Sequence, residues 1–135
     1  MNAKTIMTCL ATGVVYIALE MGLHRGLLAG AYQATSTIWR PQSEMKNLLP
    51  IMMLGQVLFG FFFGFIYTRG YESGKGTLSQ GFRYGLMMAL MLGPMSGLVW
   101  YVVLPIPQNI AFAWAIGGSV QMIILGLVAG AIYKK

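Results

Sequence analysis

Hydrophobic and polar positions along the chain separate into four long apolar runs joined by shorter polar segments. The most uniform run, Leu48 to Thr68, contains no formally charged residue, and Gln56 is its only strongly polar side chain. At about 1.5 Å per residue, a helix of this length spans a hydrocarbon core of about 30 Å. The run therefore predicts a transmembrane helix, and the remaining runs follow as further crossings.

The pattern as a whole predicts helices over about residues 5–30, 48–68, 80–104 and 110–133. Glu20 interrupts the first run where a signal-peptide cleavage site would lie, so we expect this segment to be retained as a helix. Pro94, in the middle of the third run, predicts a local kink or loosened hydrogen bonding. The sequence thus predicts an all-α fold, a transmembrane four-helix bundle that forms a single membrane domain over residues 1–135.

Composition agrees with a membrane location. The chain is 57% hydrophobic and 9% charged, whereas a soluble domain has about 25% charged residues. The formal net charge is +6, but the basic residues lie at segment ends, where they meet anionic lipid head groups. We therefore expect the lipid bilayer as a partner and no nucleic acid.

The distribution of basic residues predicts the orientation. With four crossings, the two termini and the second loop share one side of the membrane. That side holds six basic residues, Lys4, Arg69, Lys75, Arg83, Lys134 and Lys135, and the opposite side holds three, Arg25, Arg40 and Lys46. Because cytoplasmic segments carry the excess of Lys and Arg, both termini are predicted to be cytoplasmic.

Small residues spaced four apart recur in every crossing and predict close helix packing. Lipid offers no hydrophobic force between helices, so backbone approach through glycine grooves is a main source of association. The predicted packing residues are Gly22, Gly26, Gly60, Gly64, Gly81, Gly85, Gly126 and Gly130, with Gly30, Gly93 and Gly97 extending the pattern. The GxxxG spacing does not distinguish contacts within the bundle from contacts with another protein.

Glu20 and His24 form the sharpest candidate site for protons or a ligand. An ionisable residue within a membrane helix is costly and marks a functional hypothesis, and His24 lies one helical turn after Glu20 on the same face. The pair would pass a proton or hold a polar head group near the interface. The alternative is a structural pair, with each other or with Arg25. Gln56 and Gln121 lie inside the second and fourth crossings. They either line a polar path or form hydrogen bonds from one helix to another.

Two polar segments suggest contacts at the membrane surface. Trp39 beside Arg40 is typical of an interface anchor, an amphipathic ring next to a charge that meets head groups. Glu72, Lys75 and Arg83 cluster by sequence around the second loop. They form either a docking loop for a partner or a solvated turn with an ion pair of little energetic weight.

Residue inventory argues against several kinds of chemistry. One His and one Cys do not make a structural zinc site or a two-His haem site. The sequence contains no Asp, so no Ser-His-Asp set is possible, and the segment Gly74 to Thr77 lacks the spacing of a phosphate-binding loop. We therefore predict no enzyme, no cofactor and no metal site.

Several short motifs lie around the second crossing and the start of the third. They are Ile38-Trp39-Arg40-Pro41, Glu44-Met45, Ile66-Tyr67, Gly70-Tyr71-Glu72 and Gly81-Phe82-Arg83-Tyr84-Gly85. With these motifs the chain resembles, over about residues 20 to 95, a group of small uncharacterised bacterial membrane proteins with four predicted helices. The resemblance implies the bacterial inner (cytoplasmic) membrane and no assigned activity.

The chain is small, has short loops and glycine faces, and contains no recognisable set of catalytic residues. These features favour an accessory or structural subunit that packs against a larger membrane protein complex. The alternative is a small oligomeric transporter or channel for protons or a small solute, built on Glu20, His24 and the two glutamines. The expected partners are therefore a larger membrane complex or further copies of this chain.

Overall fold

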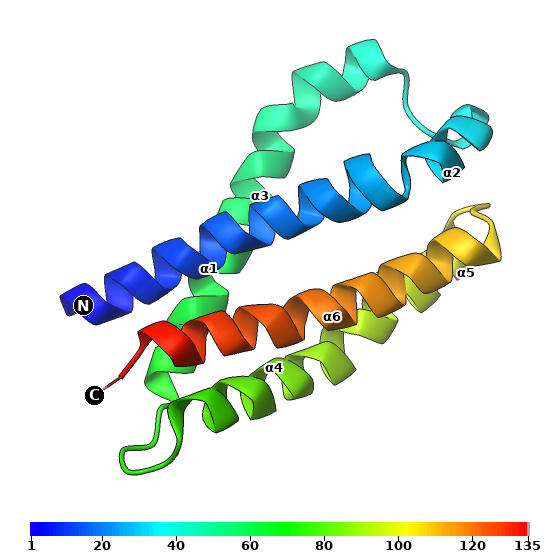
Figure 1. Cartoon of the computed structure of the whole chain (residues 1–135). Coiled ribbons are helices and arrows are strands. Elements are labelled where there is room, and N and C mark those ends of the chain that lie inside the picture. The colour runs from blue at the N-terminus through cyan, green and yellow to red at the C-terminus, as the bar shows by residue number, and fades with distance from the viewer. Residues whose placement is uncertain (135) are drawn as a thin grey trace.

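The structure is a computed structural model that describes residues 1–134, and no strand occurs among them. Four helical stretches are long and apolar enough to cross a membrane: Ala3–Leu27, Gln42–Arg69, Thr77–Val103 and Gln108–Ile132. Both termini lie at the same end of the molecule (Figure 1). The predicted all-helical fold with four long apolar helices is thus confirmed.

The first crossing changes its helical pitch toward its C-terminal end. Its elements are α1 (Ala3–Met21), the π-helical segment η1 (Gly22–Leu27), α2 (Ala29–Ala34) and the 3-10 turn η2 (Ser36–Ile38). Asn2 caps α1, because its side-chain oxygen accepts a hydrogen bond from the Thr5 backbone N–H at 2.8 Å. The helix predicted over residues 5–30 is therefore present, with a widened π-helical segment over Gly22–Leu27 and a regular α-helix again from Ala29.

The second crossing is one helix, and the third changes pitch as the first does. The remaining elements are α3 (Gln42–Arg69), α4 (Thr77–Pro94), the π-helical segment η3 (Met95–Val99), α5 (Trp100–Val103) and α6 (Gln108–Ile132). Because Pro94 lacks a backbone N–H, it interrupts the regular hydrogen-bond ladder, and η3 begins directly after it. The loosening expected at Pro94 is confirmed.

The most extensive helix contact joins α4 to α6. A Cβ atom built on Gly85 would lie 2.7 Å from the Met122 carbonyl oxygen and 2.9 Å from the Ile123 Cα atom. Gly81 meets Gly126 and Gly130 in the same way. Backbone therefore lies directly on backbone along this contact, and only glycine fits there.

A second glycine contact joins α1 to α3. A Cβ atom on Gly60 would lie 2.5 Å from the Gly13 Cα atom, and one on Gly64 would lie 3.0 Å from the Cys9 Cα atom. The buried Thr12 hydroxyl donates a hydrogen bond to the Gly60 carbonyl at 2.7 Å. Close packing and a hydrogen bond between the helices thus hold the two crossings together.

The predicted glycine face of the first crossing makes no close contact within the described residues, and its contact with another protein stays a prediction. Among the described residues, nothing lies within 4 Å of a Cβ atom built on Gly22, Gly26 or Gly30. The prediction assumed one continuous α-helix, whereas η1 begins at Gly22 and changes the direction in which the following residues point. These glycines therefore lie on the surface of the bundle.

The first half of α3 diverges from the other crossings (Figure 1). From Gln42 to Leu58 every residue is exposed except Leu49 and Gln56, which are partly exposed. The second half of α3 packs through Phe63, which joins Ala89 and Met122 in the hydrophobic core. The crossing therefore packs against its neighbours in its second half, and in its first half only Gln56, near the middle of the helix, hydrogen-bonds to another crossing.

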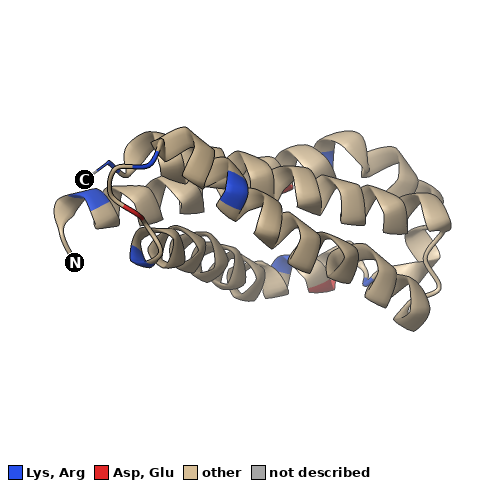
Figure 2. Cartoon of the chain, turned by 90° about the horizontal axis from the view of Figure 1, so that it is seen from below, with Lys and Arg blue, Asp and Glu red and all other residues tan. Residues whose placement is uncertain are grey.

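The surface of the bundle is largely apolar. Charged positions are sparse along the ribbon (Figure 2), and large hydrophobic side chains such as Val14, Leu90 and Val102 are exposed. Soluble proteins rarely expose such extensive apolar surface, whereas acyl chains accept it without penalty. The four long apolar helices and this surface indicate a multi-pass membrane protein.

We expect Gly85→Ala to destabilise the bundle by about 1–3 kcal/mol, because the new methyl group meets α6 backbone that has no room to move aside. The matched variant Gly22→Ala adds the same methyl group in open space and should leave stability almost unchanged. Thermal unfolding in detergent measures both. Equal midpoints for the two variants would contradict the glycine contact between α4 and α6.

Candidate functional site

A cavity of about 510 Å³ lies among α1, the α4–η3–α5 crossing and α6, with Glu20 and His24 in its wall. It is lined by Tyr16, Glu20, Leu23, His24, Phe59, Leu92, Met95, Ser96, Trp100, Leu104, Trp114, Gly118, Gln121 and Met122. We call it the Glu20 cavity. From α3 only Phe59 contributes, because the first half of that helix has diverged.

Glu20 lies at the meeting point of two further polar side chains. Its carboxylate oxygen Oε2 is 3.6 Å from His24 Nε2, and the same oxygen is 3.5 Å from Gln56 Nε2 of α3. The Glu20 side chain is 17% exposed and that of His24 is 36% exposed. The structure therefore brings together the predicted pair and adds Gln56, so Glu20 is not an isolated charge in an apolar wall.

Tyr32 of α2 extends this polar group toward α6. Its hydroxyl accepts a hydrogen bond from Trp114 Nε1 at 2.7 Å and lies 2.5 Å from His24 Nδ1. With the oxygen accepting from Trp114, the hydroxyl proton is free to be donated to Nδ1, which leaves the Nε2 proton facing Glu20. One continuous polar chain thus runs from Trp114 through Tyr32 and His24 to Glu20.

The Tyr32 hydroxyl is both a donor and an acceptor, so it can accept from Trp114 and donate to His24 at the same time. Sequence spacing gave no signal for the contact of Tyr32 with Trp114, because these residues lie far apart in the chain.

Trp39 packs against this polar chain. Its ring centroid lies 5.2 Å from that of Tyr32 and 6.0 Å from that of Trp114, and its Nε1 donates to Thr35 Oγ1 at 3.0 Å. The neighbouring Arg40 instead forms an exposed ion pair with Glu44 at 3.6 Å. Trp39 thus contributes to packing beside the Glu20 cavity, and the anchoring of Trp39 and Arg40 at a membrane interface stays a prediction.

Gln121, one of the residues that line the cavity, carries a buried donor without a partner. The residue is 5% exposed, and its side-chain Nε2 has no hydrogen-bond partner among residues 1–134. A buried amide N–H without a partner costs about 1–3 kcal/mol. Gln121 is therefore the one buried polar side chain of the described part whose hydrogen bonding the chain itself leaves incomplete.

Both π-helical segments border the same cavity. Leu23 and His24 belong to η1, and Met95 and Ser96 belong to η3. A widened turn rotates the following side chains and is frequent at functional sites. The two crossings that flank α6 thus change pitch at the level where the cavity lies.

The predicted docking loop is more ordered than its composition suggests. Lys75 forms an exposed ion pair with Glu72, and its hydrogen bond and charge lower the pKa of Glu72, with a smaller contribution from Arg83. Buried Gln80 accepts from the Glu72 backbone N–H at 2.8 Å and donates to the Glu72 and Lys75 carbonyls at 3.0 and 3.1 Å. Gln80, which sequence reasoning missed, therefore fixes the loop, while Arg83 is exposed.

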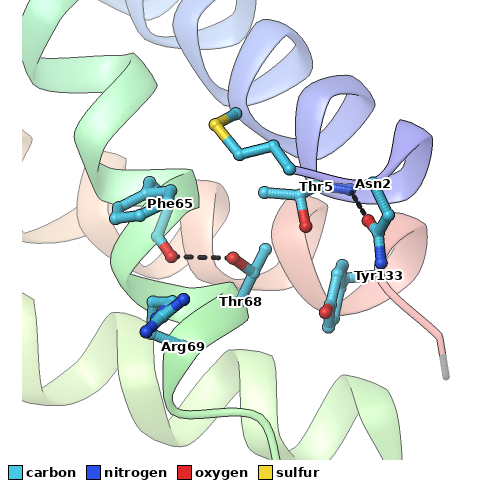
Figure 3. Close-up of a pocket in the computed structure, with 7 residues that line it drawn as sticks. Asn2, Thr5, Phe65, Thr68, Arg69 and Tyr133 are labelled. Atoms are coloured by element: carbon cyan, nitrogen blue, oxygen red, sulfur yellow. Dashed lines mark hydrogen bonds between the residues drawn. The ribbon is translucent and has the colours of Figure 1, made fainter.

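A second pocket, of about 520 Å³, lies at the end that holds both termini (Figure 3). Its lining residues are Met1, Asn2, Thr5, Phe65, Thr68, Arg69 and Tyr133. The Thr68 hydroxyl donates to the Phe65 carbonyl at 2.8 Å, and the Arg69 guanidinium lies 5.9 Å from the centre of the Phe65 ring. None of the site residues predicted from the sequence lines this pocket, so the Glu20 cavity is the stronger candidate site.

No protein-family model, curated protein or solved structure matches this chain.

We expect Tyr32→Phe to lower the free energy of unfolding by about 1–2 kcal/mol, because Trp114 Nε1 loses its acceptor and His24 loses its neighbour. Tyr101 is 46% exposed, so Tyr101→Phe is the matched control and should have little effect. Denaturant titration in mixed micelles measures both variants. If they behave alike, the polar chain through Tyr32 contributes nothing to the fold.

Proposed function

We propose that this protein is an accessory subunit of a larger membrane protein complex in the bacterial inner membrane. The observation that carries the proposal is the divergence of the first half of α3, from Gln42 to Leu58, away from its own bundle. Apolar side chains such as Ile51 and Leu54 are exposed along this half. A partner helix would bury them.

A small residue in the diverging half of α3 favours a partner helix over lipid alone as the neighbour of this half. Helices in a bilayer associate where small residues let backbones approach, and the chain uses glycines in this way between α4 and α6 and between α1 and α3. Gly55 lies in the diverging half, with nothing within 4 Å of its Cβ position among the described residues. Gly55 thus offers an unused groove for a partner helix.

The charge distribution supports an orientation with both termini in the cytoplasm. The side with the termini holds Lys4, Arg69, Lys75, Arg83, Lys134 and Lys135, twice as many basic residues as the other side. In this orientation the Glu20 cavity lies in the outer half of the membrane, and the Glu72–Lys75 loop faces the cytoplasm. A cytoplasmic partner domain would meet that loop.

We expect native mass spectrometry of protein extracted gently from its own membrane to show a stable assembly with other subunits. Gly55→Leu should release the protein from that assembly, because the larger side chain blocks approach to the diverging half of α3. Gly26→Leu, at another open glycine, should leave the assembly intact. A lone monomer in the wild-type sample would contradict the proposal.

A second candidate function, a small oligomeric transporter for protons or a small solute, is favoured by the polar group of Glu20, His24 and Gln56. An acidic side chain beside a His can exchange protons. This candidate predicts that Glu20→Gln abolishes a proton flux measured in liposomes with a pH-sensitive dye, while Glu44→Gln, at an exposed carboxylate, leaves it unchanged. Unaltered flux in Glu20→Gln would exclude the candidate.

A further inference from the structure

We infer that the pocket at the end with both termini binds the phosphate group of an anionic phospholipid. We call it the Arg69 pocket; its volume is about 520 Å³, and its lining residues are drawn in Figure 3. The inference uses the membrane location of the helices and is independent of the accessory role, which rests on the first half of α3. Four features carry it: the position of the pocket, its unused donors, the sign of its charge and the aromatic rings that lead away from it.

The Arg69 pocket lies where three crossings end. It is formed by the start of α1, the last turn of α3 and the residue that follows α6. Transmembrane helices leave the hydrocarbon core at such ends and enter the head-group region. The volume is in the range of small-molecule sites, about 300–1,000 Å³. A phospholipid would therefore meet this pocket with its head group, while its acyl chains stay in the core.

Two buried hydroxyl groups in the pocket have no hydrogen-bond partner among residues 1–134. They belong to Thr5, which is 7% exposed, and to Tyr133, which is 3% exposed, and the Thr5 hydroxyl points into the pocket (Figure 3). Thr8, further along α1, instead donates to the Lys4 carbonyl at 2.8 Å. Gln121 Nε2 is the only fully buried side-chain nitrogen or oxygen without a partner in this part of the chain. The Thr5 and Tyr133 oxygens therefore keep contact with the open space of the pocket.

Asn2 adds further donors to the pocket. Its side-chain oxygen accepts from the Thr5 backbone N–H at 2.8 Å, so its amide NH2 group is directed elsewhere and only donates. Thr68, by contrast, already donates its proton to the Phe65 carbonyl at 2.8 Å. The first turn of α1 adds the positive end of its helix dipole. The ligand that fits these groups is negatively charged and rich in acceptor oxygens, which describes a phosphate group.

The charge of the pocket has one sign. Arg69 is its one charged side chain, no Asp or Glu lines it, and the ion pairs among residues 1–134 lie elsewhere. Lys4 and Lys134 each adjoin a lining residue in the sequence, and Lys4 Nζ donates to the Lys134 carbonyl at 2.6 Å. A guanidinium group binds phosphate through two parallel hydrogen bonds. A zwitterionic head group would add a cation beside these basic residues, so an anionic head group is favoured.

A row of aromatic rings leads from Arg69 along α3. The guanidinium lies 5.9 Å from the centre of the Phe65 ring, Phe65 lies 6.3 Å from Phe62, and Phe62 lies 5.7 Å from Phe61. Phe62 is 51% exposed, so its ring is open to the acyl chains. A cation at the head of an exposed apolar track matches an amphiphile. The phosphate group is therefore assigned to a phospholipid and not to free phosphate.

The test measures thermal unfolding of the full-length protein in a neutral detergent, with dioleoyl phosphatidylglycerol, dioleoyl phosphatidylcholine or sodium phosphate added. A ligand that binds the folded protein raises the unfolding temperature in a saturable way. We expect phosphatidylglycerol to do so and phosphatidylcholine to bind about tenfold more weakly. Sodium phosphate at the same concentrations should have no effect.

Two substitutions locate the binding in the Arg69 pocket. Arg69→Gln removes the guanidinium group, and Thr5→Val replaces one hydroxyl with a methyl group of similar size. Each should weaken phosphatidylglycerol binding about tenfold, because a hydrogen bond to a charged group is lost. Arg25→Gln and Thr37→Val make the same changes at exposed positions outside the pocket and should bind as the wild type does.

Stability without lipid separates a lost ligand contact from a damaged fold. Because the Thr5 hydroxyl has no partner within residues 1–134, Thr5→Val should unfold without lipid at the same temperature as the wild type or higher. A variant that folds equally well but responds less to phosphatidylglycerol identifies Thr5 as a ligand donor.

Three results would overturn the inference: equal stabilisation by the two phospholipids, undiminished phosphatidylglycerol affinity in Arg69→Gln or in Thr5→Val, or equal affinity for sodium phosphate. The last result would assign the pocket to free phosphate. None of these bears on the accessory role, because that proposal is read from subunit mass and from Gly55→Leu. The two proposals therefore fail separately.

Discussion

Direct contact of backbone on backbone between α4 and α6 is the constraint on which the rest of the structure depends. In lipid, an apolar side chain gains no hydrophobic free energy by exchanging contact with acyl chains for contact with another helix. Helices therefore associate where van der Waals contact is closest. Gly81 and Gly85 of α4 meet Gly126 and Gly130 of α6 in this manner. This pair of helices forms the fixed wall against which α1 packs and on which the cavity is built.

The contact between α1 and α3 follows the same rule but extends over only part of α3. Gly60 and Gly64 lie against the first crossing, and Thr12 adds a hydrogen bond between the helices. Toward the other end α3 has no comparable contact and diverges. One glycine contact that runs the length of two helices and another that stops halfway together produce a bundle with a closed half and an open half.

Sequence periodicity predicted the four crossings and the glycines that pack α3, α4 and α6, because apolar length and small-residue spacing are local properties of a helix. The same periodicity correctly predicted that His24 and Glu20 lie close together on one face of the first crossing. It did not predict the divergence of α3 or the contact of Tyr32 with Trp114, since these depend on which helices meet. The lack of a hydrogen-bond partner for Gln121 Nε2 could not be predicted for the same reason. The π-helical turn at Gly22 was missed as well, and it turned a predicted packing face toward the surface.

The divergence of α3 makes the inclination of this helix responsive to bilayer thickness. Transmembrane helices adjust to a thicker or thinner hydrocarbon layer mainly by changing their inclination to the membrane normal. α3 is held to α1 at Gly60 and Gly64 and by the contact of Gln56 with Glu20, whereas the residues before Gln56 are nearly all exposed. This part of the helix therefore meets little resistance to a change of angle. A thicker bilayer would bring it closer to parallel with α1 and a thinner one would increase the angle, so the surface that it offers to a partner helix would depend on the lipid environment.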